Sequence, residues 1–288
     1  MKIAYTSDLH IDVSTSNREA ALIIAEAVAE EQPDVFVLAG DVGNTLDDLR
    51  DTLAIFEAAA VAKLFVPGNH DVWIETRHGE LLDSRTKYQR LIPELCREMG
   101  FHDLGREPVI AGSIGFAGSL GWYDYSFADP RLGLDEGAYW AGRYENEIWW
   151  DRKMTYWIGE TAAPGQTSRK RMRDPEVCSE LVRRLDDHLA SIEDDVEQIV
   201  AVVHTLPFLA GLPRSEPPYY LDAYTGSNRL GDTLMAHPKV KHMIGGHKHL
   251  SGDWEVEGIQ IHRRILGRIE GADDMREQAA NAFGVLAI

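Results

Sequence analysis

The chain has 288 residues, of which 44% are hydrophobic and 26% charged, an ordinary composition for a globular protein with a sizeable core. Its formal net charge of -18 repels phosphate backbones at long range, so we do not expect nucleic acid as a partner. Cys96 and Cys178 lie far apart, which favours a reducing compartment. Without a signal-like N-terminus or a run of transmembrane length, the sequence predicts a cytoplasmic protein with no membrane partner, and it leaves the oligomeric state open.

The first third of the chain alternates between predicted strands and helices. Apolar runs predict strands at 2–7, 34–40 and 63–68, and helical spacing predicts helices at 17–31 and 47–61. Nearly continuous apolar strands in a βαβαβ order are typical of a parallel sheet that is covered on both faces, which predicts an α/β fold. A further helix is predicted over residues 80–99, ending at Gly100.

The rest of the chain contains an unusual aromatic segment. Residues 122–173 hold five of the seven tryptophans, look helical in parts and lack a strand rhythm. We interpret this segment as an insertion, or cap, within a single domain of residues 1–288. Around it the sequence predicts a strand pair, a helix, a Pro-rich loop and closing strands, at 108–121, 175–192, 198–205, 206–226, 240–246, 253–266 and 283–288.

Metal-ligand residue types follow five predicted strands directly. The carboxyl ends of strands in an α/β sheet meet at one edge, so these side chains are expected to share a site. Asp8 and His10 are two residues apart, as are His247 and His249, so on an extended backbone each pair would point the same way. Seven such groups are too many for one ion but serve two if one carboxylate bridges. The predicted ligands are Asp8, His10, Asp41, Asn69, His204, His247 and His249.

Each motif also has a structural interpretation when taken alone. "GNHD" at 68–71 is compatible with a capped turn, and "GHKH" at 246–249 with a surface loop. Their joint occurrence, each directly after a predicted strand, favours a common site. The remaining histidines have no such context and are interpreted as structural or surface residues: His78, His102, His188, His237, His242 and His262.

Together, "DLH", "GD", "GNHD", a strand-ending histidine and "GHKH" resemble the motif blocks of the calcineurin-like metallophosphoesterases. The resemblance implies a four-layer α/β/β/α sandwich, with the helical, aromatic-rich insertion over the metal site. It also implies two divalent ions (manganese, iron or zinc, with manganese favoured). One ion would be held by Asp8, His10, Asp41 and His249, and the other by Asp41, Asn69, His204 and His247. The second block reads "GDVGN", so Asn44 stands where an acidic residue is frequent in the family.

The resemblance also implies catalytic roles. His70 would contact a phosphoryl oxygen or protonate the leaving group, and Asp71 would orient His70. Position relative to the strand ends adds expected substrate contacts, which are Trp122, Tyr123, Arg214, Tyr219 and Tyr220. The basic run at 169–171 with Arg173 could neutralise an anionic substrate, although a solvated loop is the favoured interpretation.

The expected function is that of a metal-dependent phosphoesterase. It would hydrolyse a small phosphodiester by attack of a hydroxide that bridges the two metals. A phosphomonoesterase is the second candidate and a nuclease the third, because the acidic charge is poorly suited to tracking nucleic acid. A metal-free interaction scaffold is the candidate from outside the enzymes. A cap over the site would admit small phosphoesters and exclude folded phosphoproteins.

Overall fold

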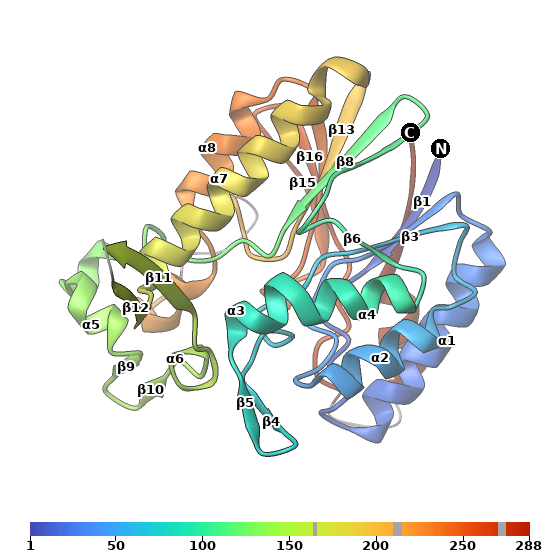
Figure 1. The fold of residues 1–288 in the computed structure, drawn as a ribbon. Helices are drawn as coiled ribbons and strands as arrows, with labels where there is room; N and C mark the ends of the chain where they lie inside the picture. The colour runs from blue at the N-terminus through green and yellow to red at the C-terminus, as the bar shows by residue number, and fades with distance from the viewer. Residues whose placement is uncertain (164–165, 210–214, 270–274) are drawn as a thin grey trace.

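Two main sheets organise the molecule, which is described here by a computed structural model (Figure 1). The first sheet has the order β17-β1-β2-β3-β6, in which β1, β2, β3 and β6 run parallel and β17 pairs antiparallel at the edge. Its strands are β1 (Lys2–Thr6), β2 (Val35–Leu38), β3 (Ala62–Phe65), β6 (His102–Asp103) and β17 (Phe283–Ala287). The structure describes residues 1–163, 166–209, 215–269 and 275–288.

The second sheet has the order β15-β16-β14-β13-β8-β7. Its four inner strands run parallel, and β7 and β15 pair antiparallel at the two edges. The strands are β7 (Val109–Ala111), β8 (Ile114–Ser119), β13 (Gln198–Val203), β14 (Val240–Gly245), β15 (Gly252–Val256) and β16 (Ile259–Arg263).

Side-chain alternation along the strands produces two apolar cores. In β2, Val35 and Val37 join a cluster with Phe116 and Val202 of the second sheet, so this core lies between the sheets. The alternate residues of β2 face the helices instead. Figure 1 shows helices on the outer faces of both sheets, which agrees with the expected α/β class. These helices are α1 (Thr15–Glu31), α2 (Leu46–Ile55), α4 (Ile92–Glu98), α7 (Asp174–Ile192), α8 (Asn228–Ala236) and α9 (Met275–Asn281).

The predicted helix at 80–99 is wrong at its start. Glu80–Leu82 forms β5, which pairs with β4 (Glu75–Arg77) in a projecting hairpin. The helical stretch begins only after Asp83, whose side chain accepts from the Thr86 N–H as an N-cap. It continues through α3 (Ser84–Thr86) and a π-turn (Lys87–Leu91) into α4. The predicted helix at 47–61 ends earlier, at Ile55, and α8 and α9 were not predicted.

The insertion also contains strands, contrary to expectation. Two hairpins lie within it, formed by β9 (Arg143–Tyr144) with β10 (Glu147–Ile148) and by β11 (Ile158–Ala163) with β12 (Gln166–Arg171). The basic run at 169–171 therefore lies on a strand and not in a loop. Short helices complete this segment and the following loops: η2 (Pro130–Leu132), α5 (Glu136–Trp140), α6 (Asp151–Met154), η3 (Glu193–Asp195) and η4 (Tyr220–Tyr224). In the described ranges, every helix falls short of the length and apolar character needed to cross a bilayer.

Candidate metal centre

The seven predicted ligand side chains come together at one edge of the two sheets. Their atoms form overlapping sets, each within 4.8 Å: Asp8 with His10 and His249, and Asp41 with His204 and His247. A third set joins His10 and Asp41 to His70. Because His10 and Asp41 belong to more than one set, the donors form one continuous centre. The ends of β1, β2, β3, β13 and β14 supply them.

Four of these residues have a left-handed backbone conformation and not that of an extended strand, and this conformation sets the direction of their side chains. The φ angles are 55° at Asp8, 44° at His10, 54° at Asp41 and 70° at His247. The backbone at Asp8 and His10 is therefore not extended as expected, although the two side chains do converge on one set of donors. Hydrogen bonds from Asp8 N to Gly40 O (2.9 Å) and from His10 N to Asp41 O (3.0 Å) hold this loop against the next one. Such backbone is uncommon for residues with a side chain and is concentrated at functional sites.

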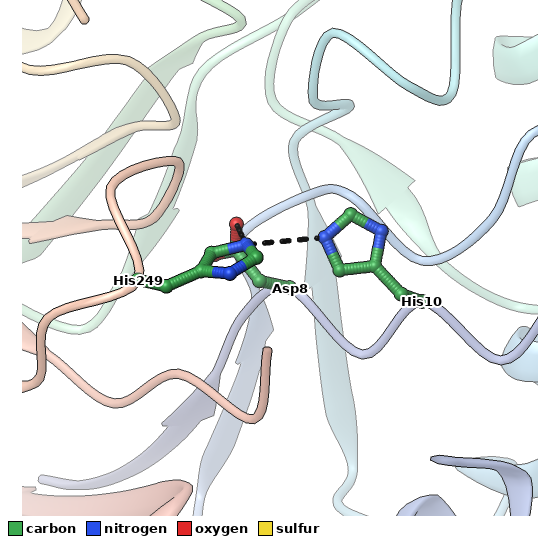
Figure 2. Close-up of side chains that lie close together, drawn as sticks. All are labelled: Asp8, His10 and His249. Carbon is green, nitrogen blue, oxygen red and sulfur yellow. Dashed lines mark hydrogen bonds and ion pairs between the residues drawn. The ribbon is translucent and has the colours of Figure 1, made fainter. Parts of the chain in front are cut away.

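The first half of the centre, formed by Asp8, His10 and His249, brings two imidazoles and a carboxylate close together (Figure 2). His249 Nε2 lies 3.5 Å from Asp8 Oδ1 and 3.3 Å from His10 Nε2. His10 Nε2 lies 3.9 Å from Asp41 Oδ2. Asp8 is held from behind by Ser7 Oγ at 2.5 Å and by the backbone N–H of His247. Two ring nitrogens this close need a proton or a cation between them, so the donor set fits a divalent ion.

In the second half of the centre, hydrogen bonds to backbone carbonyls fix the orientation of the His204 and His247 rings. His204 Nδ1 donates to the Ala39 carbonyl at 2.8 Å, and His247 Nε2 donates to the Tyr224 carbonyl at 3.0 Å. The other nitrogen of each neutral ring therefore carries a lone pair. Both lone pairs face the Asn69 Oδ1 oxygen, at 3.2 and 2.9 Å. His204 Nε2 also lies 3.3 Å from Asp41 Oδ2. Acceptors converging in this way are the arrangement that a cation requires.

The electrostatics favour positive charge at the same point. Burial lowers the pKa of His204, but the carboxylates of Asp41 and Asp8 outweigh it and raise that pKa to about 9. Burial raises the pKa of Asp41, but His204 and His70 hold it well below its usual range. Burial and His204 together lower the pKa of His247 to about 3. The centre therefore attracts a cation, and a proton takes that place on His204 when no ion is bound.

The family of this chain follows from a comparison with known protein families. The model of the calcineurin-like phosphoesterase family matches residues 1–251. The chain belongs to this family.

Individual members of the calcineurin-like phosphoesterase family are similar over different extents. "[Acyl-carrier-protein] phosphodiesterase PptH" of Mycobacterium tuberculosis (strain ATCC 25618 / H37Rv) is 30% identical over 120 residues, which are 40% of this chain and 35% of that protein. The alignment thus spans about a third of this curated relative. The crystal structure of phosphopantetheinyl hydrolase (PptH) from Mycobacterium tuberculosis has a TM-score of 0.76 at 18% identity, covering 99% of this chain and 95% of that one. A dimetal phosphatase from Danio rerio has a TM-score of 0.55 at 14% identity, covering 99% and 91%. At these identities the structures show a shared fold.

His70 lies beside the ligands, but Asp71 does not orient it. His70 Nδ1 lies 2.9 Å from Asn44 Oδ1, and Asn44 Nδ2 donates to Asp12 Oδ2 at 2.5 Å. Asp12 thus fixes the amide so that its oxygen faces the ring. Trp73 stacks on the ring at 4.0 Å between centroids. Asn44 therefore takes the position predicted for Asp71, and the signal in the sequence was its place where family members often carry an acidic residue.

The carboxylate of Asp71 instead gathers backbone N–H groups. It accepts from Asp41 N (2.9 Å), Val42 N (3.0 Å), Gly43 N (3.3 Å) and Gly68 N (2.6 Å). These donors belong to the two loops that follow β2 and β3. Asp71 therefore holds the loop of Asp41 in place, which is a role in backbone geometry and not in proton transfer.

We expect Asp71→Ala to lower the free energy of unfolding of the metal-free protein by about 3 kcal/mol, because several buried N–H groups lose their acceptor. Urea denaturation in the presence of a chelator measures this without a contribution from metal loss. Asp47→Ala is the control, since Asp47 is exposed and pairs only at the surface with Arg77 (2.6 Å). Equal free energies for the two variants would contradict the role assigned to Asp71.

Three of the predicted substrate contacts are buried and cannot meet a ligand. Trp122 is 0% exposed and donates to Asp174, and Tyr123 is 1% exposed and donates to Asp151. Tyr220 is 2% exposed and donates to the Ala138 carbonyl. These aromatics pack the insertion onto the sandwich, so the prediction of substrate contact is wrong for them. Tyr219 is exposed and remains a prediction, and Arg214 lies outside the described residues.

The arginines of the basic run bond to other parts of the protein. Arg171 donates to the carbonyls of Arg152 and Thr155, and Arg173 pairs with Glu136, which gives both arginines a structural role. Asp151 was not predicted at all, although it accepts a hydrogen bond from the predicted ligand Asn69. Its contact crosses 82 positions of sequence, and no local pattern marks it.

Proposed function

We propose that this chain is a metal-dependent phosphodiesterase whose two metals are held by the seven ligands described above, with Asp41 shared between them. The convergence of acceptor atoms around Asp41, with ring tautomers set by backbone carbonyls, carries this proposal. Two divalent ions would lower the pKa of bound water and neutralise charge that develops on phosphoryl oxygens. Manganese, iron and zinc all suit the mixed carboxylate, imidazole and amide donors, and we favour manganese.

The chain's own residues would position the substrate and supply a proton. His70 is held between Asn44 and Trp73, with its ring centroid 4.8 Å from that of His10. In that position we infer that His70 contacts a phosphoryl oxygen or protonates the leaving oxygen. A cysteine nucleophile is not supported, because both cysteines are buried and burial raises the pKa of Cys178 to about 12.

The substrate class we propose follows the relative named for an acyl-carrier-protein phosphodiester. Such a diester joins a flexible arm to a carrier protein, so only the arm and the phosphate need to reach the centre. This differs from a free small diester, which the sequence favoured, and it relaxes the expectation that folded proteins are excluded. We further propose that residues 122–173 act as a cap, since Trp149 of this segment lies 6.0 Å from the His247 ring. We also retain the cytoplasm as the proposed location.

A panel of substrates tests this proposal. The protein, loaded in turn with manganese, zinc and iron, would be assayed on bis(4-nitrophenyl) phosphate, 4-nitrophenyl phosphate, single-stranded DNA and a phosphopantetheinylated carrier protein. We expect bis(4-nitrophenyl) phosphate and the carrier protein to be cleaved, with release of the arm from the carrier protein detected by intact-mass spectrometry. Preference for the monoester would favour a phosphomonoesterase, and cleavage of DNA alone a nuclease. Full metal occupancy without hydrolysis of any of the four substrates would contradict the proposal.

A further inference from the structure

A buried carboxylate of the insertion reaches directly into the metal centre. Asp151 begins α6 and is 1% exposed. Its Oδ1 accepts from Asn69 Nδ2 at 3.1 Å and from Trp73 Nε1 at 2.7 Å, and its Oδ2 accepts from Tyr123 OH at 3.3 Å. All three partners are donors in these contacts, so the site is suited to a carboxylate, which has only acceptor atoms.

The bond to Asn69 decides which atom of that amide meets a cation. The amide has an oxygen and a nitrogen of nearly equal size, and only the oxygen is a metal ligand. With its nitrogen bonded to Asp151, Asn69 directs its oxygen toward His204 and His247. The reversed amide would place oxygen against the carboxylate of Asp151, which is repulsive in a buried setting.

The surrounding backbone fixes the carboxylate itself. The Ile74 N–H donates to the Met154 carbonyl at 2.7 Å, which joins α6 to the loop that follows β3. Thr155 closes the turn through its N–H and its hydroxyl, both bonded to the Asp151 carbonyl at 2.8 Å. The insertion is therefore attached to the loop that carries Asn69 at more than one point.

We propose that Asp151 is a positioning residue of the metal centre, which holds the Asn69 amide with its oxygen toward the second metal and thereby couples the insertion to that metal. This inference rests on the proposed function only in requiring that the centre binds two ions. It does not depend on which phosphoester is cleaved.

Metal titration of the metal-free protein tests the role without any substrate. Isothermal titration with Mn²⁺ would be done for wild type, Asp151→Ala, Asp151→Asn and Asp174→Ala. In Asp151→Ala we expect the second ion to bind about 10–100-fold more weakly, with the first little changed. Asp151→Asn should stay close to wild type, because its amide oxygen can still accept from Asn69 and Trp73.

Asp174→Ala is the matched control for general loosening of the insertion. Asp174 is also a buried carboxylate, and it accepts from Trp122 Nε1 at 2.9 Å and from Tyr125 OH at 2.5 Å, without contact to a metal ligand. Its removal should leave both metal affinities within about threefold of wild type, far below the 10–100-fold loss expected for removing a ligand's partner.

Three results would overturn the inference. These are wild-type affinity in Asp151→Ala, an equal loss in Asp174→Ala, or a loss from Asp151→Ala that persists in full when Asn69 is already alanine. If Asp151→Ala does not fold, Asp151→Ser replaces it, because a serine hydroxyl is too short to reach the Asn69 amide. A wild-type protein that binds two ions but cleaves no phosphoester would overturn the proposed function and leave this inference standing.

Discussion

Asp41→Asn is expected to lower turnover of bis(4-nitrophenyl) phosphate by about 10²–10³-fold or more, because charge stabilisation at the centre is lost. It should also lower the metal content of the purified protein. In the native chain, Asp41 Oδ1 accepts from the His70 N–H at 2.9 Å, and Oδ2 faces His204 at 3.3 Å. An asparagine that keeps the first bond would turn its NH₂ group toward His204. The ring nitrogen would then be satisfied by a hydrogen bond and no longer need a cation.

Plasma mass spectrometry for metal and steady-state kinetics for turnover would be measured on the same preparation. Asp253→Asn provides the control. Asp253 lies on β15, away from the centre, and pairs with His262 (2.9 Å) and Arg264 (2.6 Å). It should retain its metals and its rate. Full occupancy and wild-type turnover in Asp41→Asn would rule out Asp41 as the bridging ligand.

His70→Ala is expected to keep both metals and to lose activity in a way that depends on the leaving group. For an alkyl diester we expect a loss of about 10²-fold, within the range for a missing general acid, and for a nitrophenyl diester a loss of less than about tenfold. A nitrophenolate needs little protonation, whereas an alkoxide needs it. Burial lowers the pKa of His70 to about 4, although Asp41 opposes this, so an anionic substrate would be needed to favour the doubly protonated ring.

Brønsted plots for a series of aryl and alkyl diesters would measure this dependence. Asn44→Ala should shift the plot in the same direction but less, because the ring loses its 2.9 Å partner and keeps its stack on Trp73. His78→Ala should leave it unchanged, since His78 is exposed in the turn between β4 and β5. A uniform loss across all leaving groups would limit His70 to binding the phosphoryl group.

The convergence of the seven predicted ligands could be inferred because each follows a strand whose apolar run is evident in the sequence. The carboxyl ends of the parallel strands in both sheets lie at the same edge of the sandwich, so Asp41 after β2 and His204 after β13 meet although 163 positions separate them. Their backbone geometry could not be predicted, because the left-handed φ of Asp8 and His10 depends on hydrogen bonds from the neighbouring loop. Chain order thus located the centre but not the directions of its side chains.

Proximity in sequence was a poor guide to the partners around the ligands. Asp71 is next to His70 in the chain, yet its carboxylate turns to the backbone of the loop after β2, and Asn44 bonds the ring instead. Trp122 follows a strand directly, yet its indole turns into the core and donates to Asp174. Adjacent residues in a tight turn diverge in direction, so the contacts of a buried polar side chain depend on tertiary packing that no local pattern records.

The left-handed backbone at four of the proposed ligand positions also bears on how such a centre evolves. Residues with a side chain held in this conformation cost about 1 kcal/mol or more each, and glycine avoids that cost. At Asp8, His10, Asp41 and His247, the residue that would best stabilise the metal-free loop is therefore one that cannot bind an ion. Stability and function are opposed at these positions, and selection for thermal tolerance alone would erode the centre before it altered the sheets beneath it.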